Sequence, residues 1–256
     1  MNFKILASKK DLAALNIAKE LSNLHIDVQL LEHHSIYSEN IDKQIPGDFY
    51  IFVSMHKSEK EFKSLTIHAP GNWHNADFGG NPEKVCPTSA FFLKHIFKIL
   101  NEKAKDSGYL VSLEVTHHGP YLEKPCCFIE IGSTEQEWID EKAGKIIAET
   151  IKEAIESFDK ANGYKYTAAV GIGGPHYCPN FNKVQNGSGY ALGHIIPEYA
   201  LPLTETMLKE AIEKTIEKPR VAILDWKGLG KAEQRKKILK VLEKHAMQII
   251  KTSQIK

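Results

Sequence analysis

The sequence lacks an excess of charge of either sign: 33 lysines and arginines face 32 aspartates and glutamates, which gives a net charge of +1. No overall basic field therefore points to nucleic acid, although a local basic patch would serve the same purpose. The chain also lacks any apolar run long enough to span a bilayer, so we expect no membrane-spanning helix and no membrane partner.

Cysteine is scarce, with four residues in 256. The adjacent pair Cys126 and Cys127 suits no ordinary disulfide framework, and no Cys-x-x-Cys pair of the kind used by structural zinc modules is present. The first residues show none of the apolar run that marks a signal peptide. We therefore expect reduced thiols and a cytoplasmic protein.

Strands and helices alternate along the chain. Residues 3–7 and 26–31 read as strands with a helix between them, and this strand–helix–strand opening is typical of a parallel sheet. With 42% hydrophobic and 25% charged residues, the chain has an ordinary globular composition and enough length for a substantial core. We predict a single α/β catalytic domain over residues 1–256, with a mixed, mostly parallel sheet flanked by helices.

Residues 172–203 interrupt this alternation, because they are rich in glycine, proline, asparagine and tyrosine, and they are predicted to be mostly loop. A loop of that length inside a compact domain is usually functional. The other predicted elements are helices at 88–105, 139–158, 204–216 and 231–245, and strands at 49–54, 109–115, 127–131, 167–170 and 220–224.

The first chemical motif is Val-Thr-His-His-Gly-Pro at 115–120, where an apolar strand breaks into imidazoles, glycine and proline. Strand alternation places Glu114 and Thr116 on a polar face. If that geometry continues, His118 joins them and His117 turns to the apolar face. Glu114 would then fix the tautomer of a neighbouring histidine. The alternative for one of the two histidines is a hydrogen-bonded, partly buried side chain without a chemical role.

The second motif is Gly-Ile-Gly-Gly-Pro-His-Tyr-Cys-Pro at 171–179. Gly173 and Gly174 leave backbone N–H groups unobstructed at the end of a strand, where they would form an oxyanion hole, and His176 follows at once. A tight turn that simply needs glycines is the alternative. The placement of the run before a histidine and a long loop favours function.

Two further segments carry histidines beside turns: His68 to His74, which includes Trp73, and Gly193 to Tyr199, which includes His194. Three or four imidazoles with a carboxylate suit zinc and an activated water. None of the histidines has the spacing of a helical zinc site, so a metal site would have to be assembled from separate loops.

The C-terminal stretch from Lys227 to His245 holds seven basic and only two acidic residues. It is either an ordinary solvated helix face or a contact surface for phosphates. The turn Asp225-Trp226-Lys227-Gly228 just before it pairs an aromatic ring with a base, a combination that suits stacking on a nucleotide.

These motifs, together with Ser8-Lys9-Lys10-Asp11 after the first strand, resemble in order the motifs of the archaeal and plant D-aminoacyl-tRNA deacylases, essentially from end to end. The resemblance implies hydrolysis of the ester that joins a D-amino acid to the 3′ end of tRNA, dependence on Zn²⁺, and a fold related to peptidyl-tRNA hydrolase and nucleoside phosphorylases. It makes tRNA the expected partner of a chain that we expect to be a monomer.

The reaction assigns expected roles to the motif residues, all of which are predicted to converge on one pocket. The alternatives are a zinc hydrolase of a small ester or amide, and a tRNA- or nucleotide-binding module without catalysis. The expected catalytic residues are His118, His176, Thr116 and Glu114; the expected substrate contacts are Gly173, Gly174, His194, Trp73 and Lys227; and the expected metal ligands are His117, His118, His176 and His194.

Overall fold

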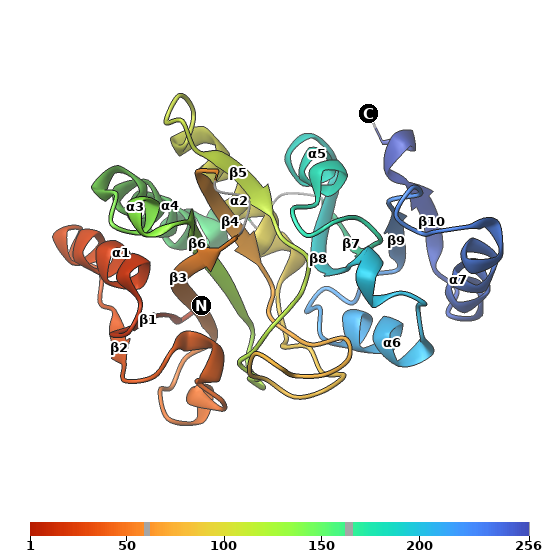
Figure 1. Ribbon diagram of the computed structural model, residues 1–256, viewed down its shortest axis with the longest axis horizontal. Helices are drawn as coiled ribbons and strands as arrows, with labels where there is room; N and C mark the ends of the chain where they lie inside the picture. Colours follow the sequence, from red (N-terminus) through yellow and green to blue (C-terminus); the bar gives the residue numbers. More distant parts are fainter. Residues whose placement is uncertain (59–61, 162–165, 256) are drawn as a thin grey trace.

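The computed structural model describes residues 1–58, 62–161 and 166–255, and its strands form two sheets that lie side by side (Figure 1). The first sheet has the order β2-β1-β3-β6-β4-β5. In it, β4 is antiparallel to β6, and the other neighbouring strands are parallel. Its strands are β1 (Phe3–Ser8), β2 (Gln29–Leu31), β3 (Phe49–Lys57), β4 (Ser64–His68), β5 (Leu110–Leu113) and β6 (Cys126–Ser133).

The second sheet is wholly parallel, with the order β10-β9-β7-β8. Its strands are β7 (Thr167–Ile172), β8 (Tyr190–Ile196), β9 (Val221–Leu224) and β10 (Gln248–Lys251). The predicted α/β class and the mixed, mostly parallel strand arrangement are confirmed. The division of the strands between two sheets was not predicted.

Helices cover both sheets. α2 bridges them, because it packs against α4 on one side and against β8 on the other. No helix in the described ranges combines the length and apolarity needed to cross a bilayer. The helices are α1 (Leu12–Asn23), α2 (Ala90–Lys103), α3 (Glu135–Trp138), α4 (Glu141–Ala161), α5 (Pro179–Gly187), α6 (Glu205–Glu213) and α7 (Ala232–Lys244), with short 3-10 turns η1 (Ser35–Tyr37), η2 (Ile41–Lys43), η3 (Glu198–Ala200) and η4 (Thr252–Gln254).

The predicted long loop at 172–203 is wrong in part, because it contains α5 and β8. Pro179 occupies the first turn of α5, where its missing N–H and fixed φ favour a helix start. β8 is buried over six of its seven residues, so packing in the second sheet outweighs the weak strand propensity of Gly193 and His194.

The two sheets meet directly after β5. The N–H of Val115 donates to His176 O at 3.0 Å, and the N–H of Thr116 donates to Ile195 O at 2.9 Å. The segment that carries His117 and His118 is therefore tied to the second sheet. This connection brings the two histidine motifs together at the junction of the sheets.

Candidate active site

A cavity of about 700 Å³ lies at the carboxyl ends of β1 and β3. His117, His118 and His176 all line it, and so do His56 and Glu130. Ligand sites of α/β proteins commonly occur at this end of the strands. The prediction that the separate histidine motifs converge on one pocket is confirmed, and we call this cavity the histidine pocket.

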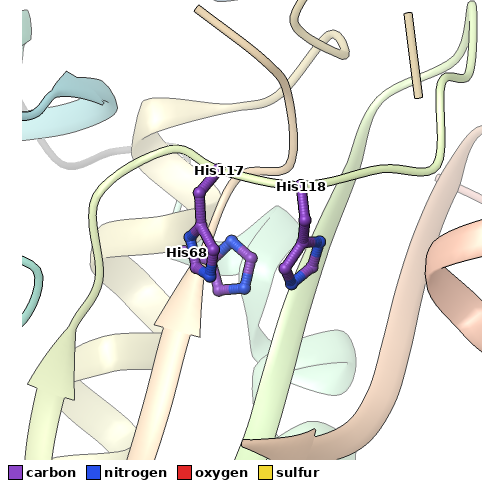
Figure 2. Close-up of side chains that lie close together, drawn as sticks. All are labelled: His68, His117 and His118. Carbon is purple, nitrogen blue, oxygen red and sulfur yellow. The ribbon is translucent and has the colours of Figure 1, made fainter. Parts of the chain in front are cut away.

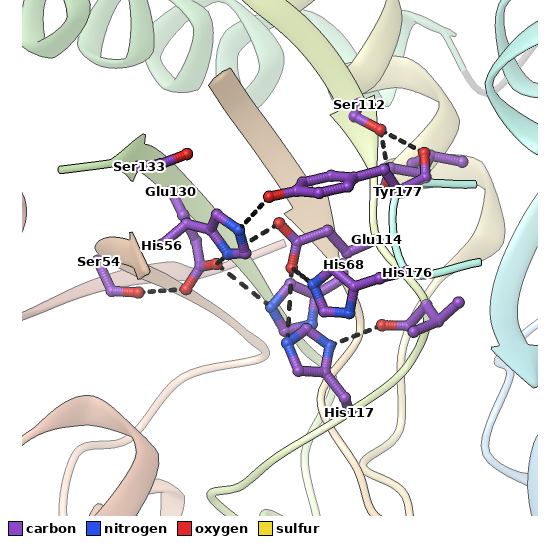
Figure 3. A network of polar contacts seen from close by, with 12 residues as sticks. Ser54, His56, His68, Ser112, Glu114, His117, Glu130, Ser133, His176 and Tyr177 are labelled. Atoms are coloured by element: carbon purple, nitrogen blue, oxygen red, sulfur yellow. Dashed lines mark hydrogen bonds and ion pairs between the residues drawn. The ribbon is translucent and has the colours of Figure 1, made fainter. Parts of the chain in front are cut away.

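Glu114 lies between His56 on one side and His176 and His117 on the other, and it contacts all three (Figure 3). Its Oε1 is 3.1 Å from His56 Nδ1, and its Oε2 is 3.2 Å from His176 Nε2 and 3.5 Å from His117 Nε2. The Glu114 side chain is fully buried, so the carboxylate needs opposite charge close by.

A second buried carboxylate, Glu130, comes from the middle of β6. Ser54 Oγ donates a hydrogen bond to its Oε1. Its Oε2 lies 3.6 Å from His56 Nδ1 and 3.7 Å from His68 Nε2. His56 therefore joins the two carboxylates into one network, which Figure 3 shows in full.

The strand alternation predicted for the first motif fails beyond β5. β5 ends at Leu113, and His118 has a φ of +42°, in the left-handed region. As a result His117, and not His118, reaches Glu114. Thr116 lines the pocket as well, and its Oγ1 accepts a hydrogen bond from the Ile195 N–H at 3.1 Å, which ties it to the junction of the sheets.

The histidines fall into two electrostatic classes. Burial acts to lower the pKa of His56, but the contacts with Glu130 and Glu114 raise it to about 9, and the pKa of His68 is raised in the same way. Burial and the neighbouring His68 hold the pKa of His117 well below its usual range and lower that of His118 to about 4. His117 and His118 are therefore neutral near pH 7 and carry a free lone pair.

The two carboxyl groups stay ionised in spite of their burial. Burial acts to raise the pKa of Glu114, but the contacts with His176 and His56 hold it below its usual value. Burial has the same effect on Glu130, whose contacts with His56 and His68 hold its pKa well below the usual range. Two buried negative charges thus lie beside imidazoles whose protons they influence.

Three histidine rings converge in Figure 2, and each directs its Nδ1 at a backbone carbonyl. His68 Nδ1 is 3.3 Å from Ala69 O, His117 Nδ1 is 2.8 Å from Val115 O, and His118 Nδ1 is 2.6 Å from Gly119 O. A carbonyl only accepts, so Nδ1 carries a proton in each ring. In the neutral His117 and His118, Nε2 therefore keeps the lone pair, whereas the raised pKa of His68 favours a second proton on its Nε2, which faces Glu130. Metal-binding histidines are commonly oriented in this way.

The residues present fit a transition metal. One nitrogen from each of His68, His117 and His118 lies within 4.8 Å of the others. His56, Glu114 and His176 form a second such group, and His68, Glu114 and Glu130 form a third. In the described part of the chain, the polar contacts of the two Glu114 oxygens are all with imidazole nitrogens. Neutral imidazoles and ionised carboxylates with free lone pairs are suitable zinc ligands.

His194 does not belong to any of these ligand groups of described residues, contrary to the predicted metal set. It is fully buried within β8, with its Nδ1 3.1 Å from Thr116 Oγ1 and its ring edge-on to Trp73. The reason is its place inside a strand of the second sheet, where its side chain faces the junction and not the pocket. Trp73 does line the pocket and donates its Nε1–H to Thr116 O.

The predicted oxyanion hole at Gly173 is also wrong. The N–H of Gly173 donates to Ile196 O at 2.8 Å, so it is not free for a substrate. Gly173 and Gly174 have φ values of +87° and +94° and pack against the turn at 225–228. A Cβ at Gly173 would lie 2.9 Å from Asp225 O. Backbone geometry and close packing explain both glycines, and neither lines the histidine pocket.

Lys227 lies in a different cavity from the histidines. This second cavity, of about 600 Å³, is lined by residues from α5, from the turn after β9 and from the C-terminal segment. Trp226 lies there with Arg235 and Lys251 against its ring, at 4.9 and 3.9 Å from the ring centroid. The structure thus separates the predicted contact at Lys227 from the histidine pocket. We call this the tryptophan cavity.

Sequence reasoning missed His56 and Glu130. Glu130 had a signal, because it is the only charged residue in the buried strand Cys126–Ser133, and an isolated charge at such a position is rarely accidental. His56 lies near the end of the apolar strand β3, and its polar neighbours gave no comparable contrast.

Comparison with known proteins points to one family. A family described as D-aminoacyl-tRNA deacylase matches residues 44–250. A D-aminoacyl-tRNA deacylase of Methanocaldococcus jannaschii is 39% identical over 93% of this chain and 95% of its own length. One from Thermococcus kodakarensis is 35% identical over 96% of this chain and 98% of its own.

A solved structure shares the fold. It belongs to a conserved protein of unknown function, with a TM-score of 0.90 and 27% identity over 99% of this chain and 96% of that one. The two-sheet arrangement is therefore shared by a crystal structure over almost the whole length of both chains.

Proposed function

This chain belongs to the D-aminoacyl-tRNA deacylase family, and on that premise we propose that its histidine pocket hydrolyses the ester between a D-amino acid and the 3′ end of tRNA. The observation that carries the proposal is the convergence of His117, His118 and His176 around the buried carboxylates of Glu114 and Glu130. The activity is that of a carboxylic ester hydrolase with tRNA as substrate.

Ester hydrolysis needs an activated water and a group that takes its proton. Glu114 Oε2, 3.2 Å from His176 Nε2, favours the tautomer with the proton on Nε2. The lone pair then remains on Nδ1 of a side chain that is one-third exposed to the pocket. His176 is accordingly our candidate for the base, with Glu114 stabilising the imidazolium that forms.

His118 is the other candidate for the base that was predicted from the sequence. Its Nδ1 is held by Gly119 O, and its lowered pKa of about 4 keeps Nε2 unprotonated near pH 7. A group with so low a pKa is a weak base. We therefore assign His118 to metal binding with His68 and His117, and leave proton transfer to His176.

We extend the proposed ester hydrolysis with a zinc site. The ligands would come from His68, His117 and His118, with Glu114, His56 and His176 as a second group. His117 supports this assignment, because its Nε2 lone pair points at the Glu114 carboxylate from 3.5 Å. A lone pair facing a carboxylate is unfavourable unless a cation lies between them. Bound Zn²⁺ would supply Lewis acidity to the reaction.

Selection between D- and L-substrates requires a wall of the pocket close to the stereocentre. Within residues 180–199, Tyr199 alone lines the histidine pocket. A wall that blocks one position on Cα rejects L-substrates more simply than attraction favours D-substrates. We therefore place this selection on the buried lining residues Asn72 and Trp73, and not on the exposed rings of Phe78 and Tyr199.

The basic face of α7 is our proposed contact for the tRNA backbone. Lys231, Lys236 and Lys240 are exposed, and none of them pairs with a carboxylate in the described ranges, whereas Lys237 and Lys244 do pair. Unpaired, solvated lysines are the groups that bind phosphates and release counterions.

The direct test is release of tyrosine from D-tyrosyl-tRNA and from L-tyrosyl-tRNA at matched concentrations. We expect rapid release from the D-ester alone. No release from the D-ester, or equal release from both, contradicts the proposal. A parallel reaction after chelation and dialysis tests the metal, since activity should fall with metal content and return with added Zn²⁺. Full activity of the metal-free protein would remove zinc from the account.

A further inference from the structure

Two exposed aromatic side chains stand at the histidine pocket. Phe78 is 65% exposed and Tyr199 is 62% exposed, and both line the cavity that contains the histidines. By contrast Trp73, which lines the same cavity, is 5% exposed. Exposed aromatic rings contribute little to the core, so these two rings call for an explanation other than folding.

The backbone that carries Phe78 is held in place on both sides. The Gly119 N–H donates to Phe78 O at 2.9 Å, and Asn72 Nδ2 donates to Gly79 O at 2.8 Å. Gly80 donates its N–H to Glu39 Oε1 at 2.6 Å. Gly79 has a φ of +74°, and a Cβ there would lie 1.8 Å from Ile36 O. The sequence thus fixes the backbone tightly and still leaves the Phe78 ring in solvent.

Tyr199 is held on an equally fixed backbone. It lies in η3, where the Glu198 N–H donates to Gly174 O at 3.0 Å. His74 Nε2 is 2.9 Å from Ala200 O, which ties η3 to the segment that leads to Phe78. A rigid frame that presents aromatic faces to solvent loses little entropy when a planar ligand stacks on them.

The shape of the substrate determines which planar group can reach these rings. The amino acid is the free end of aminoacyl-tRNA, and the polynucleotide has to leave the pocket through its opening. With the ester at the histidines, the amino acid lies on the closed side, and the terminal nucleoside lies on the open side. The exposed rings therefore face the nucleoside.

We infer that Phe78 and Tyr199 form a stacking platform for the adenine base at the 3′ end of tRNA, an inference that rests on the proposed function. Bases stack on aromatic side chains with a strength of about 1–3 kcal/mol per base. Such a platform positions the ester by binding the neighbouring base, and it makes no contact with the reacting atoms.

The test compares two ligands that carry the same D-tyrosyl amide, which is not hydrolysed. One has the amide on the 3′ position of adenosine, and the other has it on the matching ribose without a base. Calorimetry gives the dissociation constant of each for the wild type, Phe78→Ala and Tyr199→Ala. We expect each substitution to weaken the adenosine ligand about 5- to 150-fold and to leave the base-free ligand unchanged.

Two further variants control this experiment. Tyr37→Ala removes an aromatic ring that is 52% exposed but does not line the pocket, and it should leave both constants unchanged. Phe78→Trp keeps an aromatic face and should retain binding of the adenosine ligand. An equal loss for both ligands, or no loss for either, overturns the platform. If the wild type binds neither ligand, the proposed function itself fails, which distinguishes the two.

Discussion

The histidine pocket and the tryptophan cavity both lie where parallel strands end, yet they hold buried carboxylates with different partners. In the tryptophan cavity, the one buried carboxylate of the lining, Asp225, accepts a hydrogen bond from the neutral amide of Asn180 at 2.9 Å. In the histidine pocket, the buried Glu114 lies against the imidazoles of His56, His117 and His176. An amide holds a carboxylate without exchanging protons, whereas imidazoles gain and lose protons near neutral pH.

The lysines of the tryptophan cavity add to this contrast. Lys183 and Lys227 lie at the tryptophan cavity with their side chains in solvent. Solvated charges of this kind attract phosphates at low cost and interact weakly with their neighbours. The comparison therefore separates the histidine pocket, our proposed catalytic centre, from a solvated basic surface.

The largest expected effect comes from Glu114→Gln, which removes the central charge of the histidine pocket. The substitution keeps the size of the side chain but ends the control of His56, His117 and His176. We expect the single-turnover rate on D-tyrosyl-tRNA to fall by about a thousandfold, within the range for lost acid–base catalysis.

Glu210→Gln is the matched control for this loss, because Glu210 is also a buried carboxylate but does not line the histidine pocket. Its rate should stay within about threefold of the wild type, because the substitution lies outside the pocket and is expected to affect stability instead of the reaction. If the rate of Glu114→Gln also stays in that range, Glu114 has no part in the reaction.

An intermediate effect is expected on stability through Asp11, which lines the histidine pocket and caps α1. Burial raises its pKa from 3.8 to about 6, although backbone N–H donors, Ala14 and Met55 among them, act to lower it. A raised pKa in the folded state gives stability below pH 3.8 that is lost as the pH rises through about 6. Relative to Asp11→Asn, the wild type should therefore lose about 3 kcal/mol of unfolding free energy over that interval.

Urea unfolding of both proteins at pH 4, 5, 6 and 7 measures this difference. The Asn side chain does not ionise, so the wild-type protein alone should show the loss that belongs to position 11. A constant difference between the two proteins at all four pH values would mean that Asp11 titrates at the same pH in the folded and the unfolded chain.

The smallest effect is expected at α7. Lys236→Ala with Lys240→Ala removes two exposed lysines and should weaken tRNA binding severalfold, while the slope of log affinity against log salt falls by about 2. Lys145→Ala with Lys152→Ala on α4 provides a control of equal charge loss. An unchanged salt slope in the α7 variant would exclude that helix from the phosphate contact.

The sequence allowed the meeting of the histidine motifs to be predicted, because each motif follows a strand and strands of one α/β domain end at common edges. It did not allow the roles of His117 and His118 to be told apart. Their orientation depends on a chain that leaves β5 after Leu113 and on the positive φ of His118. Such a change in the direction of the chain cannot be predicted from a periodic pattern of residues.

His56 and Glu130 were not predicted from the sequence for a similar reason. His56 and Glu130 come from β3 and β6, which pair from Tyr50–Cys126 to Lys57–Ser133 although residues 58–125 lie between them in the sequence. Pairing of that kind depends on sheet order, which local pattern does not contain. Glu130 was still recognisable as a lone charge in an apolar strand, whereas the ligand role of His194 was excluded only by its burial in β8.

The most direct measurement is a crystal structure of the protein with the D-tyrosyl amide of 3′-aminoadenosine. We predict that the amide carbonyl lies in the histidine pocket beside His176 and above Glu114. Electron density for the tyrosyl group in the tryptophan cavity, or anywhere else away from these histidines, would contradict the assignment of the reaction to this cluster.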